Sequence, residues 1–463
     1  MYKQMYVLSC LITIFIFVLL SGCSNEEQAN KYANHSFIYY KTNCNLLKDN
    51  DYYNYDSKPD YENSYFENII ANENDEDDED EMNYDYKIDS ILNIALHESR
   101  MAISSINAIV ISPDGSLWGW GLNLFGELGA DSRMPSSIPI QIGSDMDWVQ
   151  LTMGLHHTMA LKDDGSLWTW GACIIYWINP ANSYPSDADQ QTSPVRFGDD
   201  YNWISVFTGS SHAFGIKSNG SLWAWGRNRT GMLGDGTTIP RYTPVQIGDC
   251  LDWIYISPGR DNTFGIKSDG SLWAWGSNRL GRLGINEHAL PSLYQSYPIQ
   301  IGADARWVHV STGGGHTIAL QENGSLWGWG ENRFGQLGDG TTIDRVEPTH
   351  VYTNTTWVHA VAGDRMTYAI CIDGYLWAWG WNHNGELGIG TTENSSVPVQ
   401  IGTDSNWVDV VAASRPLAKT DCGAIWSWGP GEVRVPTQGS LGDGTSEDHH
   451  VPIIIIPSQG ATY

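Results

Sequence analysis

Basic residues are scarce in this sequence. Its 463 residues include 25 Lys and Arg against 53 Asp and Glu, which gives a formal net charge of −28 at pH 7. Residues 101–463 are acidic on their own, with 34 acids and 18 bases. Binding to a nucleic-acid backbone depends on Lys and Arg side chains that displace counterions from phosphates. We therefore expect no nucleic-acid partner.

The cysteines lack the spacing of a metal site. Zinc sites need clustered ligands, often paired as Cys-x-x-Cys, and no such pair occurs among the seven cysteines. Nothing in the sequence specifies a disulfide pairing either. The cysteines beyond the N-terminal segment are Cys44, Cys173, Cys250, Cys371 and Cys422. We expect no metal and no cofactor.

Sequence motifs of catalysis are also missing. The chain has no Gly-x-Ser-x-Gly nucleophile elbow, no Ser/His/Asp order and no zinc-binding helix. Its Gly-Asp-Gly-Thr segments offer one carboxylate each, at Asp235, Asp339 and Asp443. A calcium loop needs several carboxylates at alternating positions, so we interpret these segments as turns. The sequence predicts a protein that is not an enzyme.

A hydrophobic segment opens the chain. Lys3 precedes an apolar run over residues 5–20, and the tetrapeptide Leu-Ser-Gly-Cys ends at Cys23. This pattern resembles a bacterial lipoprotein signal, which implies a signal peptide over residues 1–22 and a membrane anchor of two or three acyl chains on Cys23. An ordinary signal peptide or a single-span anchor is the alternative. The lipoprotein signal and both of these alternatives place the rest of the chain outside the cytoplasm.

Residues 23–90 differ in composition from everything that follows. They are rich in Asn, Asp, Glu and Tyr and show no sustained period, and residues 24–100 contain 19 acids and 6 bases. Such a segment cannot bury enough apolar area to offset the entropy of ordering. The sequence predicts a disordered acidic tether, extended by self-repulsion. We interpret the acidic run over 74–81 as a solvated spacer, with loose binding of divalent cations as the alternative.

Residues 91–463 repeat one motif seven times. Each copy has a Gly-led turn followed by Leu-Trp-x-Trp-Gly or a close variant, and successive copies lie 49 to 55 residues apart. The copies span residues 115–121, 165–171, 220–226, 270–276, 324–330, 374–380 and 423–429. Self-similarity at this period indicates a propeller or a solenoid.

Each repeat reads as four short strands. A strand that opens with Trp-Val or Trp-Ile precedes a second strand, the Leu-Trp-x-Trp strand comes third, and a fourth strand carries a proline, as expected for an outer edge. Small sheets that are apolar on both faces must stack against neighbours on each side. Seven Leu-Trp-x-Trp strands and seven proline strands predict an all-β fold, a seven-bladed β-propeller.

Three motifs recur in a fixed order. They are Gly-x-x-His-Thr-x-Ala-Leu, Asp-Gly-x-Leu-Trp-x-Trp-Gly and Asn-x-x-Gly-x-Leu-Gly, and they resemble the regulator of chromosome condensation repeat family from about residue 98 to 457. The resemblance implies a seven-bladed β-propeller. The family's eukaryotic founder is a nuclear exchange factor for the small GTPase Ran. Bacterial relatives include a secreted protein that inhibits β-lactamases by binding them with one propeller face.

One histidine position recurs between the first two strands. It holds His157, His212 and His316, and we align Asn262, Met366 and Pro416 with it in other repeats. Because the histidine follows the repeat and is dispensable in some copies, we interpret it as a structural residue of a turn. A metal ligand or catalytic base is the alternative interpretation.

Positions that vary between repeats are the candidates for binding, because the scaffold fixes the positions that recur. Equivalent positions in a ring lie on one face, and Arg and aromatic residues are enriched in interface hot spots. The candidates in the Gly-x-x-His turns are His156, Arg260, Asp261, Asp364, Arg365 and Arg415; those in the Asn-x-x-Gly loops are Arg229, Arg279, Arg333, Trp381 and His383. Ordinary variation of solvated loops is the alternative.

Two repeats carry unusual loops. In the second, the Asn-x-x-Gly-x-Leu-Gly motif is replaced by an apolar stretch containing Tyr176 and Trp177, and in the fourth a longer loop over 288–297 contains Tyr294. Aromatic residues exempt from a role in the scaffold form a candidate binding loop. Decay of the repeat, with the loop folded onto its own blade, is the alternative.

The sequence thus predicts a monomeric, lipid-anchored propeller at the cell envelope. Its expected role is to hold a protein partner, or less readily a wall glycan, on one face of the propeller. Inhibition of a secreted enzyme is the first alternative. Guanine-nucleotide exchange is the second, but export separates the chain from cytosolic GTPases, and no long insertion resembles a nucleotide-displacing wedge.

Overall fold

The structure is a computed structural model that describes residues 100–172, 190–286, 293–303, 305–351, 353, 355–431 and 439–458. The predicted signal peptide over 1–22, the tether over 23–90, the lipidation site Cys23 and the loop residues Tyr176 and Trp177 lie outside the described residues. Within the described ranges, no helix has the length and apolar character needed to cross a membrane.

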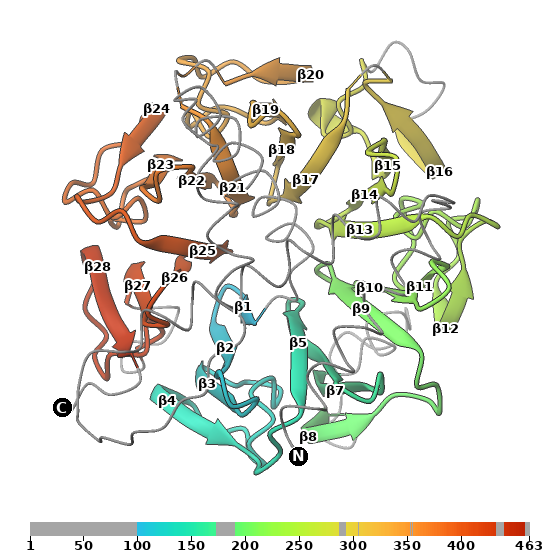
Figure 1. The fold of residues 1–463 in the computed structure, drawn as a ribbon, viewed down its shortest axis with the longest axis horizontal. Helices are drawn as coiled ribbons and strands as arrows, with labels where there is room; N and C mark the ends of the chain where they lie inside the picture. The colour runs from blue at the N-terminus through green and yellow to red at the C-terminus, as the bar shows by residue number, and fades with distance from the viewer. Residues whose placement is uncertain are drawn as a thin grey trace, which may run out of the picture. The chain divides into compact units, whose positions relative to one another are not determined.

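Seven antiparallel four-stranded sheets follow one another around a ring (Figure 1). In each sheet the spatial order of the strands equals their order in the chain, so one repeat forms one blade. The first strands of neighbouring blades contact one another around the axis, and the fourth strands lie at the rim (Figure 1). The predicted all-β, seven-bladed propeller is confirmed.

The strand bounds of the first four blades are as follows. Blade one contains β1 (Met101–Ile103), β2 (Asn107–Ile111), β3 (Leu117–Gly121) and β4 (Ser136–Ile142). Blade two contains β5 (Trp148–Met153), β6 (His157–Lys162), β7 (Leu167–Ala172) and β8 (Gln190–Arg196). Blade three contains β9 (Trp203–Thr208), β10 (His212–Lys217), β11 (Leu222–Gly226) and β12 (Arg241–Gln246). Blade four contains β13 (Trp253–Pro258), β14 (Asn262–Lys267), β15 (Leu272–Ser277), the 3-10 turn η3 (Arg279–Gly281) and β16 (Tyr294–Ile301).

The remaining three blades repeat the arrangement. Blade five contains β17 (Trp307–Thr312), β18 (His316–Gln321), β19 (Leu326–Gly330) and β20 (Arg345–His350). Blade six contains β21 (Trp357–Ala362), β22 (Met366–Cys371), β23 (Leu376–Gly380) and β24 (Ser395–Gln400). Blade seven contains β25 (Trp407–Ala412), β26 (Pro416–Thr420), β27 (Ile425–Gly429) and β28 (His449–Ile456).

The turn before each Leu-Trp-x-Trp strand is built from short-range hydrogen bonds. In blade one, the Asp114 carboxylate accepts from the Ser116 backbone N–H at 3.0 Å, and the Ser116 hydroxyl accepts from the Trp118 indole at 3.1 Å. The Ser116 hydroxyl also donates to the Asp114 carboxylate at 2.7 Å, and this bond, followed by the backbone bond, holds the pKa of Asp114 below its ordinary value. Gly115 has φ +86°, and a Cβ there would lie 2.1 Å from the Met146 carbonyl oxygen. The motif therefore encodes a turn that only glycine fits.

The second tryptophan of the motif joins each blade to the one before it. In blade five, Trp329 is fully buried, and its indole N–H donates to the Arg282 carbonyl of blade four at 3.0 Å. Trp170, Trp275 and Trp428 donate in the same way to Glu127, Met232 and Glu386 at 2.7, 2.9 and 2.9 Å. The equivalent rings of Trp120, Trp225 and Trp379 are also fully buried, but their N–H groups have no partner among the described residues. Burial of the large ring, with a satisfied N–H in four of the seven blades, makes this residue the main contact between blades.

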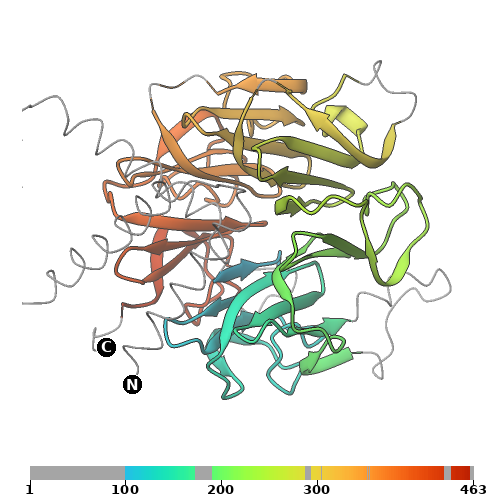
Figure 2. The same ribbon diagram turned by 45° about the vertical axis from the view of Figure 1, so that its right-hand side comes forward.

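The ring closes by packing the last blade against the first. A buried cluster joins Met101, Ile103, Ala108, Val110 and Trp120 to Leu417, Ile425 and Ile455. Backbone bonds reinforce it, since Gly444 N–H donates to the Ser137 carbonyl at 2.9 Å. The Ser414 hydroxyl and the Arg415 guanidinium both donate to the Ser105 carbonyl at 3.0 Å. Figure 2 shows blades one and seven side by side.

Candidate functional site

The two sets of variable positions lie on one face of the propeller. In an antiparallel blade, the turn from the first to the second strand and the loop from the third to the fourth strand emerge at the same end. We call the described residues of these turns and loops the loop face. The prediction that the Gly-x-x-His turns and the Asn-x-x-Gly loops form rings is therefore consistent with the strand order, and residues of both kinds line one pocket.

Hydrogen bonds between neighbouring blades fix the turns of the loop face. Backbone N–H groups of Leu155, Ser210, Gly314 and Asp364 donate to the carbonyls of Ser210, Gly259, Gly363 and Ala413 at 3.2, 3.3, 3.2 and 2.7 Å. Each of these bonds runs from the turn of one blade to the turn of the next. The turns therefore support one another around the axis, and the side chains they carry have a rigid base.

A buried asparagine fixes each of the described loops that begin with the Asn-x-x-Gly motif. In blade five, the Asn332 amide donates to the Thr341 and Ile343 carbonyls at 3.2 and 3.1 Å, and its oxygen accepts from Leu337 N–H at 2.9 Å. Asn123, Asn228, Asn278 and Asn382 are buried in the same way. The recurrent asparagine is thus structural, and it positions the variable residues beside it.

The recurring histidines are structural too, as predicted. His316 and Thr367 face each other across blades five and six, with Nε2 2.9 Å from Oγ1. The Thr367 hydroxyl donates to the Gln336 carbonyl at 2.7 Å, so His316 is the donor to Thr367 and carries its proton on Nε2. His212 and Thr263 repeat the arrangement at 3.2 Å. Burial lowers the pKa of His316 to about 3 and that of His212 to about 4.

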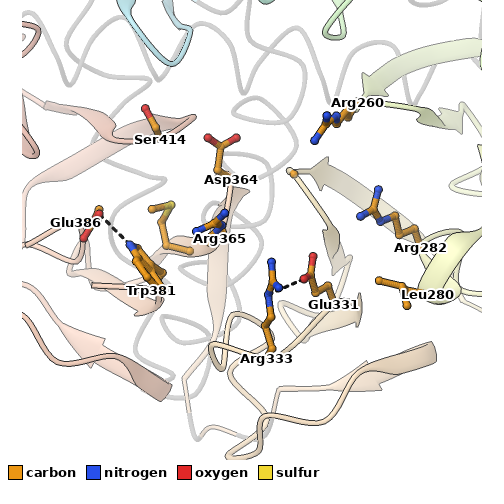
Figure 3. Close-up of a pocket in the computed structure, with 12 residues that line it drawn as sticks. Arg260, Leu280, Arg282, Glu331, Arg333, Asp364, Arg365, Trp381, Glu386 and Ser414 are labelled. Atoms are coloured by element: carbon orange, nitrogen blue, oxygen red, sulfur yellow. Dashed lines mark hydrogen bonds and ion pairs between the residues drawn. The ribbon is translucent and has the colours of Figure 1, made fainter. Parts of the chain in front are cut away.

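A concave pocket of about 460 Å³ opens on the loop face over blades four to seven (Figure 3). Five predicted binding residues line it: Arg260, Arg333, Asp364, Arg365 and Trp381. The other charged residues of the lining, which were not predicted, are Arg282, Glu331 and Glu386. The side chains come from the turns and loops just described and surround a common space (Figure 3).

Aromatic rings and arginines gather at one side of the pocket, where Arg333, Arg365 and Trp381 belong to its lining. Phe334 and Trp381 meet edge to face with ring centroids 4.6 Å apart. The Arg365 guanidinium lies 5.4 Å from the Trp381 centroid and 5.5 Å from that of Phe334, and Arg333 lies 4.8 Å from Phe334. His383 stacks on Trp381 at 3.8 Å. Cation–π contacts of this kind attract an arginine to the face of an aromatic ring.

The charges of the pocket are only partly neutralised from within. Arg333 pairs with Glu331 at 2.8 Å, and the buried carboxylate of Glu386 accepts from the Trp381 indole at 3.1 Å. Within the part of the chain that the structure describes, no carboxylate forms an ion pair with Arg260, Arg282 or Arg365. Burial lowers the pKa of Arg282. The pocket is therefore suited to binding an anion.

Among the described acids that line the pocket, Asp364 alone has no ion pair or side-chain hydrogen bond. Its surface is exposed, but the concave surroundings limit hydration of the carboxylate and raise its pKa, while Arg365 and Arg260 act in the opposite direction. Among the described residues, no three His, Cys, Asp or Glu side chains are placed to hold a metal ion. Four arginines, three carboxylates and Trp381 in the lining can recognise a ligand by charge and hydrogen bonds.

Several predicted binding residues lie outside the pocket. Arg229 and Asp261 pair with each other at 2.9 Å. Arg279 is exposed in η3, and His156 packs against the Phe125 ring at 4.6 Å. Tyr294 was predicted in a loop, but it is the first residue of the outer strand β16 and is paired with Ser277. These residues stay candidates for a wider contact surface.

The prediction that Arg415 is exposed on the loop face is wrong. Arg415 is fully buried beside Ser105, and burial lowers its pKa to about 10. The turn of blade seven is one residue shorter than the others. The bond that closes it runs from the Ala413 N–H to the Arg415 carbonyl, two residues on, whereas in blade five it runs from the Gly313 N–H to the His316 carbonyl, three residues on. Arg415, not Pro416, therefore takes the place of the buried histidine. The shorter spacing before the last repeat was the available signal.

The pocket residues that were missed share recognisable positions. Arg282 and Glu386 occupy the variable position of Gly-x-Leu-Gly, and Glu331 directly follows the Leu-Trp-x-Trp-Gly motif. At the variable position of Gly-x-Leu-Gly, the backbone carbonyl of Arg282 or Glu386 accepts a hydrogen bond from the tryptophan of the next blade. The scaffold therefore uses the backbone of this residue and leaves its side chain free to vary. Comparing that column across repeats gives Glu127, Met232, Arg282, Gln336 and Glu386, which would have shown the variation.

Fold and site together define a seven-bladed β-propeller made of tandem repeats, with a charged recognition pocket on its loop face. The chain belongs to the RCC1-like domain family, which it matches over residues 178–460. Residues 114–161 match the regulator of chromosome condensation (RCC1) repeat. The resemblance seen in the sequence is thereby confirmed.

Two curated relatives show the extent of the similarity. The ultraviolet-B receptor UVR8 of Arabidopsis thaliana is 30% identical over 267 residues, which cover 56% of this chain and 47% of UVR8. The protein RCC2 homolog of Xenopus laevis is 32% identical over 153 residues, which cover 32% of this chain and 20% of that protein. The match thus spans about half of UVR8 and a smaller part of the RCC2 homolog.

Solved structures share the fold. Human WBSCR16 superposes with a TM-score of 0.60 at 20% identity and covers 69% of this chain and 86% of its own. Yeast RCC1 (Prp20), solved bound to Kap60, superposes with a TM-score of 0.60 at 20% identity and covers 68% of this chain and 78% of its own. At this identity the similarity establishes the architecture.

Proposed function

We propose that this protein is a lipid-anchored, extracytoplasmic recognition module that binds a protein partner on its loop face and carries out no catalysis. The observation that carries the proposal is the pocket over blades four to seven. Arginines and a tryptophan, the residue types typical of hot spots, stand there on turns and loops fixed by hydrogen bonds. A preorganised surface of this kind loses little entropy on binding.

The relatives are consistent with binding of proteins. Yeast RCC1 (Prp20), which has the same fold, was solved bound to Kap60, and work on Prp20p concerns its binding to Gsp1p and histones. Those partners belong to that protein. For this chain the acidic composition and the N-terminal segment favour a partner at the cell envelope instead.

Membrane anchoring is proposed from Leu-Ser-Gly-Cys ending at Cys23. We expect Cys23→Ser, or an inhibitor of the globomycin type, to block lipidation and leave the signal peptide uncleaved. The protein should then migrate as a larger species and lose incorporation of labelled palmitate. An unchanged size and unchanged labelling in both treatments would refute the lipid anchor and leave the propeller's binding role untouched.

The binding role is tested by affinity capture with the full chain in detergent, against envelope and culture-medium proteins of the source organism. We expect a discrete partner that Trp381→Ala loses and that Arg306→Gln retains. Arg306 is the matched control because it lies beside the hairpin turn at Gly270, away from the pocket, and pairs with Glu322 at 3.4 Å. A partner captured equally by both variants would place binding elsewhere.

The same capture separates the alternatives. If the partner is a secreted enzyme whose activity falls on binding, the module acts as an inhibitor. If it is a GTPase whose nucleotide release accelerates, the module acts in exchange, and the non-catalytic proposal is wrong. Retention of the partner without either effect supports a scaffold or recognition role.

A further inference from the structure

We propose that the pocket recognises an acidic segment of the protein partner, with Arg365 as the central carboxylate donor and Arg260 and Arg282 beside it. This inference rests on the proposed function and specifies the chemistry of its ligand. It follows from how the three guanidinium groups are held, from the charge around them, and from the shape of the pocket.

Arg365 is held in place without using its hydrogen-bond donors. Its guanidinium lies against Trp381 and Phe334, at 5.4 and 5.5 Å from their ring centroids. The two ring contacts restrict the side chain, and its N–H groups donate to no described residue, so they stay available. A fork of parallel N–H donors matches the two oxygens of a carboxylate. Arg365 is thus preorganised as a carboxylate receptor.

Arg260 and Arg282 add positive charge that the protein does not neutralise by an ion pair with any described residue. Burial is the main cause that lowers the pKa of Arg282. The nearby carboxylates of Glu331 and Asp261 offset part of this effect, and the charges of Arg260 and Arg279 add to it, so the net pKa is still lowered. Residues 101–463 are strongly acidic in sum, so the arginines form a local exception. An anionic ligand would relieve both the burial cost and the mutual repulsion.

The surroundings favour carboxylates of a protein over a phosphate chain. Asp364 and Glu331 stand in the same pocket and would repel a densely charged ligand such as a nucleic acid. Beyond the pocket the protein is acidic, which disfavours an extended polyanion. Leu280 and Trp381 supply apolar surface next to the arginines. A short segment in which Asp or Glu alternates with apolar residues matches this mixture.

The test uses the full chain in detergent and a short fluorescein-labelled peptide of alternating Glu and Leu, with the matched Gln and Leu peptide as the neutral probe. We expect fluorescence polarisation to show that the Glu peptide binds and that the Gln peptide binds with an affinity at least about tenfold lower, because hydrogen bonds to charged groups are strong. Arg365→Gln should lower the affinity for the Glu peptide by about tenfold, and Arg306→Gln should leave that affinity unchanged.

Two further variants distinguish a receptor from general charge attraction. Arg365→Lys keeps the charge but loses the planar fork, so it should recover only part of the affinity. Asp364→Asn removes a carboxylate that competes for the arginines and should raise the affinity for the Glu peptide severalfold. Equal binding of the two peptides, equal effects of Arg365→Gln and Arg306→Gln, or weakening by Asp364→Asn would overturn the inference. Near-ultraviolet circular dichroism checks that each variant is folded.

Other ligands and other failures give distinct results. Displacement of the Glu peptide by a lower concentration of a single-stranded oligonucleotide would assign the pocket to nucleic acid and refute the inference. Self-association that Arg365→Gln abolishes, without peptide binding, would assign it to a second copy of this chain. If a captured partner depends on Trp381 but not on Arg365, the acidic-segment inference fails and the proposed function stands. If no partner is captured, the proposed function fails and the inference falls with it.

Discussion

Replacing Gly338 by alanine is expected to lower the free energy of unfolding by about 3 kcal/mol, through strain and overpacking at a contact between blades. Gly338 closes the Asn-x-x-Gly-x-Leu-Gly motif of blade five and has φ +73°. A Cβ there would lie 2.7 Å from Nε1 and 2.9 Å from Cε2 of Trp379 in blade six. Trp379 is fully buried and cannot retreat from the added methyl group without disturbing the core.

The chain supplies its own control two residues away. Gly340 has φ +78°, but the nearest atom to a Cβ there is Val397 Cγ1 at 4.0 Å. Gly340→Ala should therefore cost only the backbone strain, about 1 kcal/mol. Urea unfolding followed by tryptophan fluorescence measures both variants. Equal losses would show that the motif needs glycine for its backbone angle alone and that the contact with tryptophan contributes nothing.

Mild acid is expected to destabilise the propeller more than any single substitution, because four buried histidines are held neutral. Burial lowers the pKa values of His157, His309 and His316 to about 3 and that of His212 to about 4. An unfolded chain binds protons at these sites from about pH 6.5 downward, so stability falls as the pH drops from there toward the folded pKa values. Each histidine contributes about 2 kcal/mol of loss between pH 7 and pH 5.

His316→Asn isolates one of these contributions. Blade four has Asn262 at the same position, with its amide 3.3 Å from the Thr312 hydroxyl, so the fold accepts asparagine there. The variant should lose stability at pH 7 but should narrow the difference between pH 7 and pH 5 by about 2 kcal/mol. The carboxylates with lowered pKa values do not titrate in this window, which keeps the comparison clean. An unchanged difference would mean that His316 titrates normally in the folded protein.

The fold could be predicted from the sequence because each repeat encodes the same local physics. The Asp-Gly turn before Trp118, the buried ring of Trp329 and the prolines of the outer strands each have one structural use, and seven copies of that set leave one architecture. The structural role of the turn histidines could be predicted in the same way, because a residue that recurs at the same place in several repeats is part of the scaffold.

The site was only partly predictable because it depends on side chains that the repeat leaves free. Equivalent positions of the repeats lie on one face of the propeller, and this rule predicted Arg260, Arg365 and Trp381 as binding residues. Arg282 escaped because its backbone belongs to the scaffold while its side chain does not. Arg415 was misplaced because a deletion of one residue in blade seven moves it into the buried histidine position, and a sequence pattern cannot show which side of the turn has lost a residue.

Site-specific photocrosslinking tests the central claim, that this propeller binds a protein partner through the pocket on its loop face. A photoreactive phenylalanine derivative replaces Leu280, which lines the pocket and is 45% exposed, in one full-length variant and Tyr242, which is 49% exposed on the outer strand β12, in another. In the native envelope, we expect a discrete protein adduct from position 280 and none from position 242. Adducts of equal yield from both positions, or an adduct from position 242 alone, would contradict the claim.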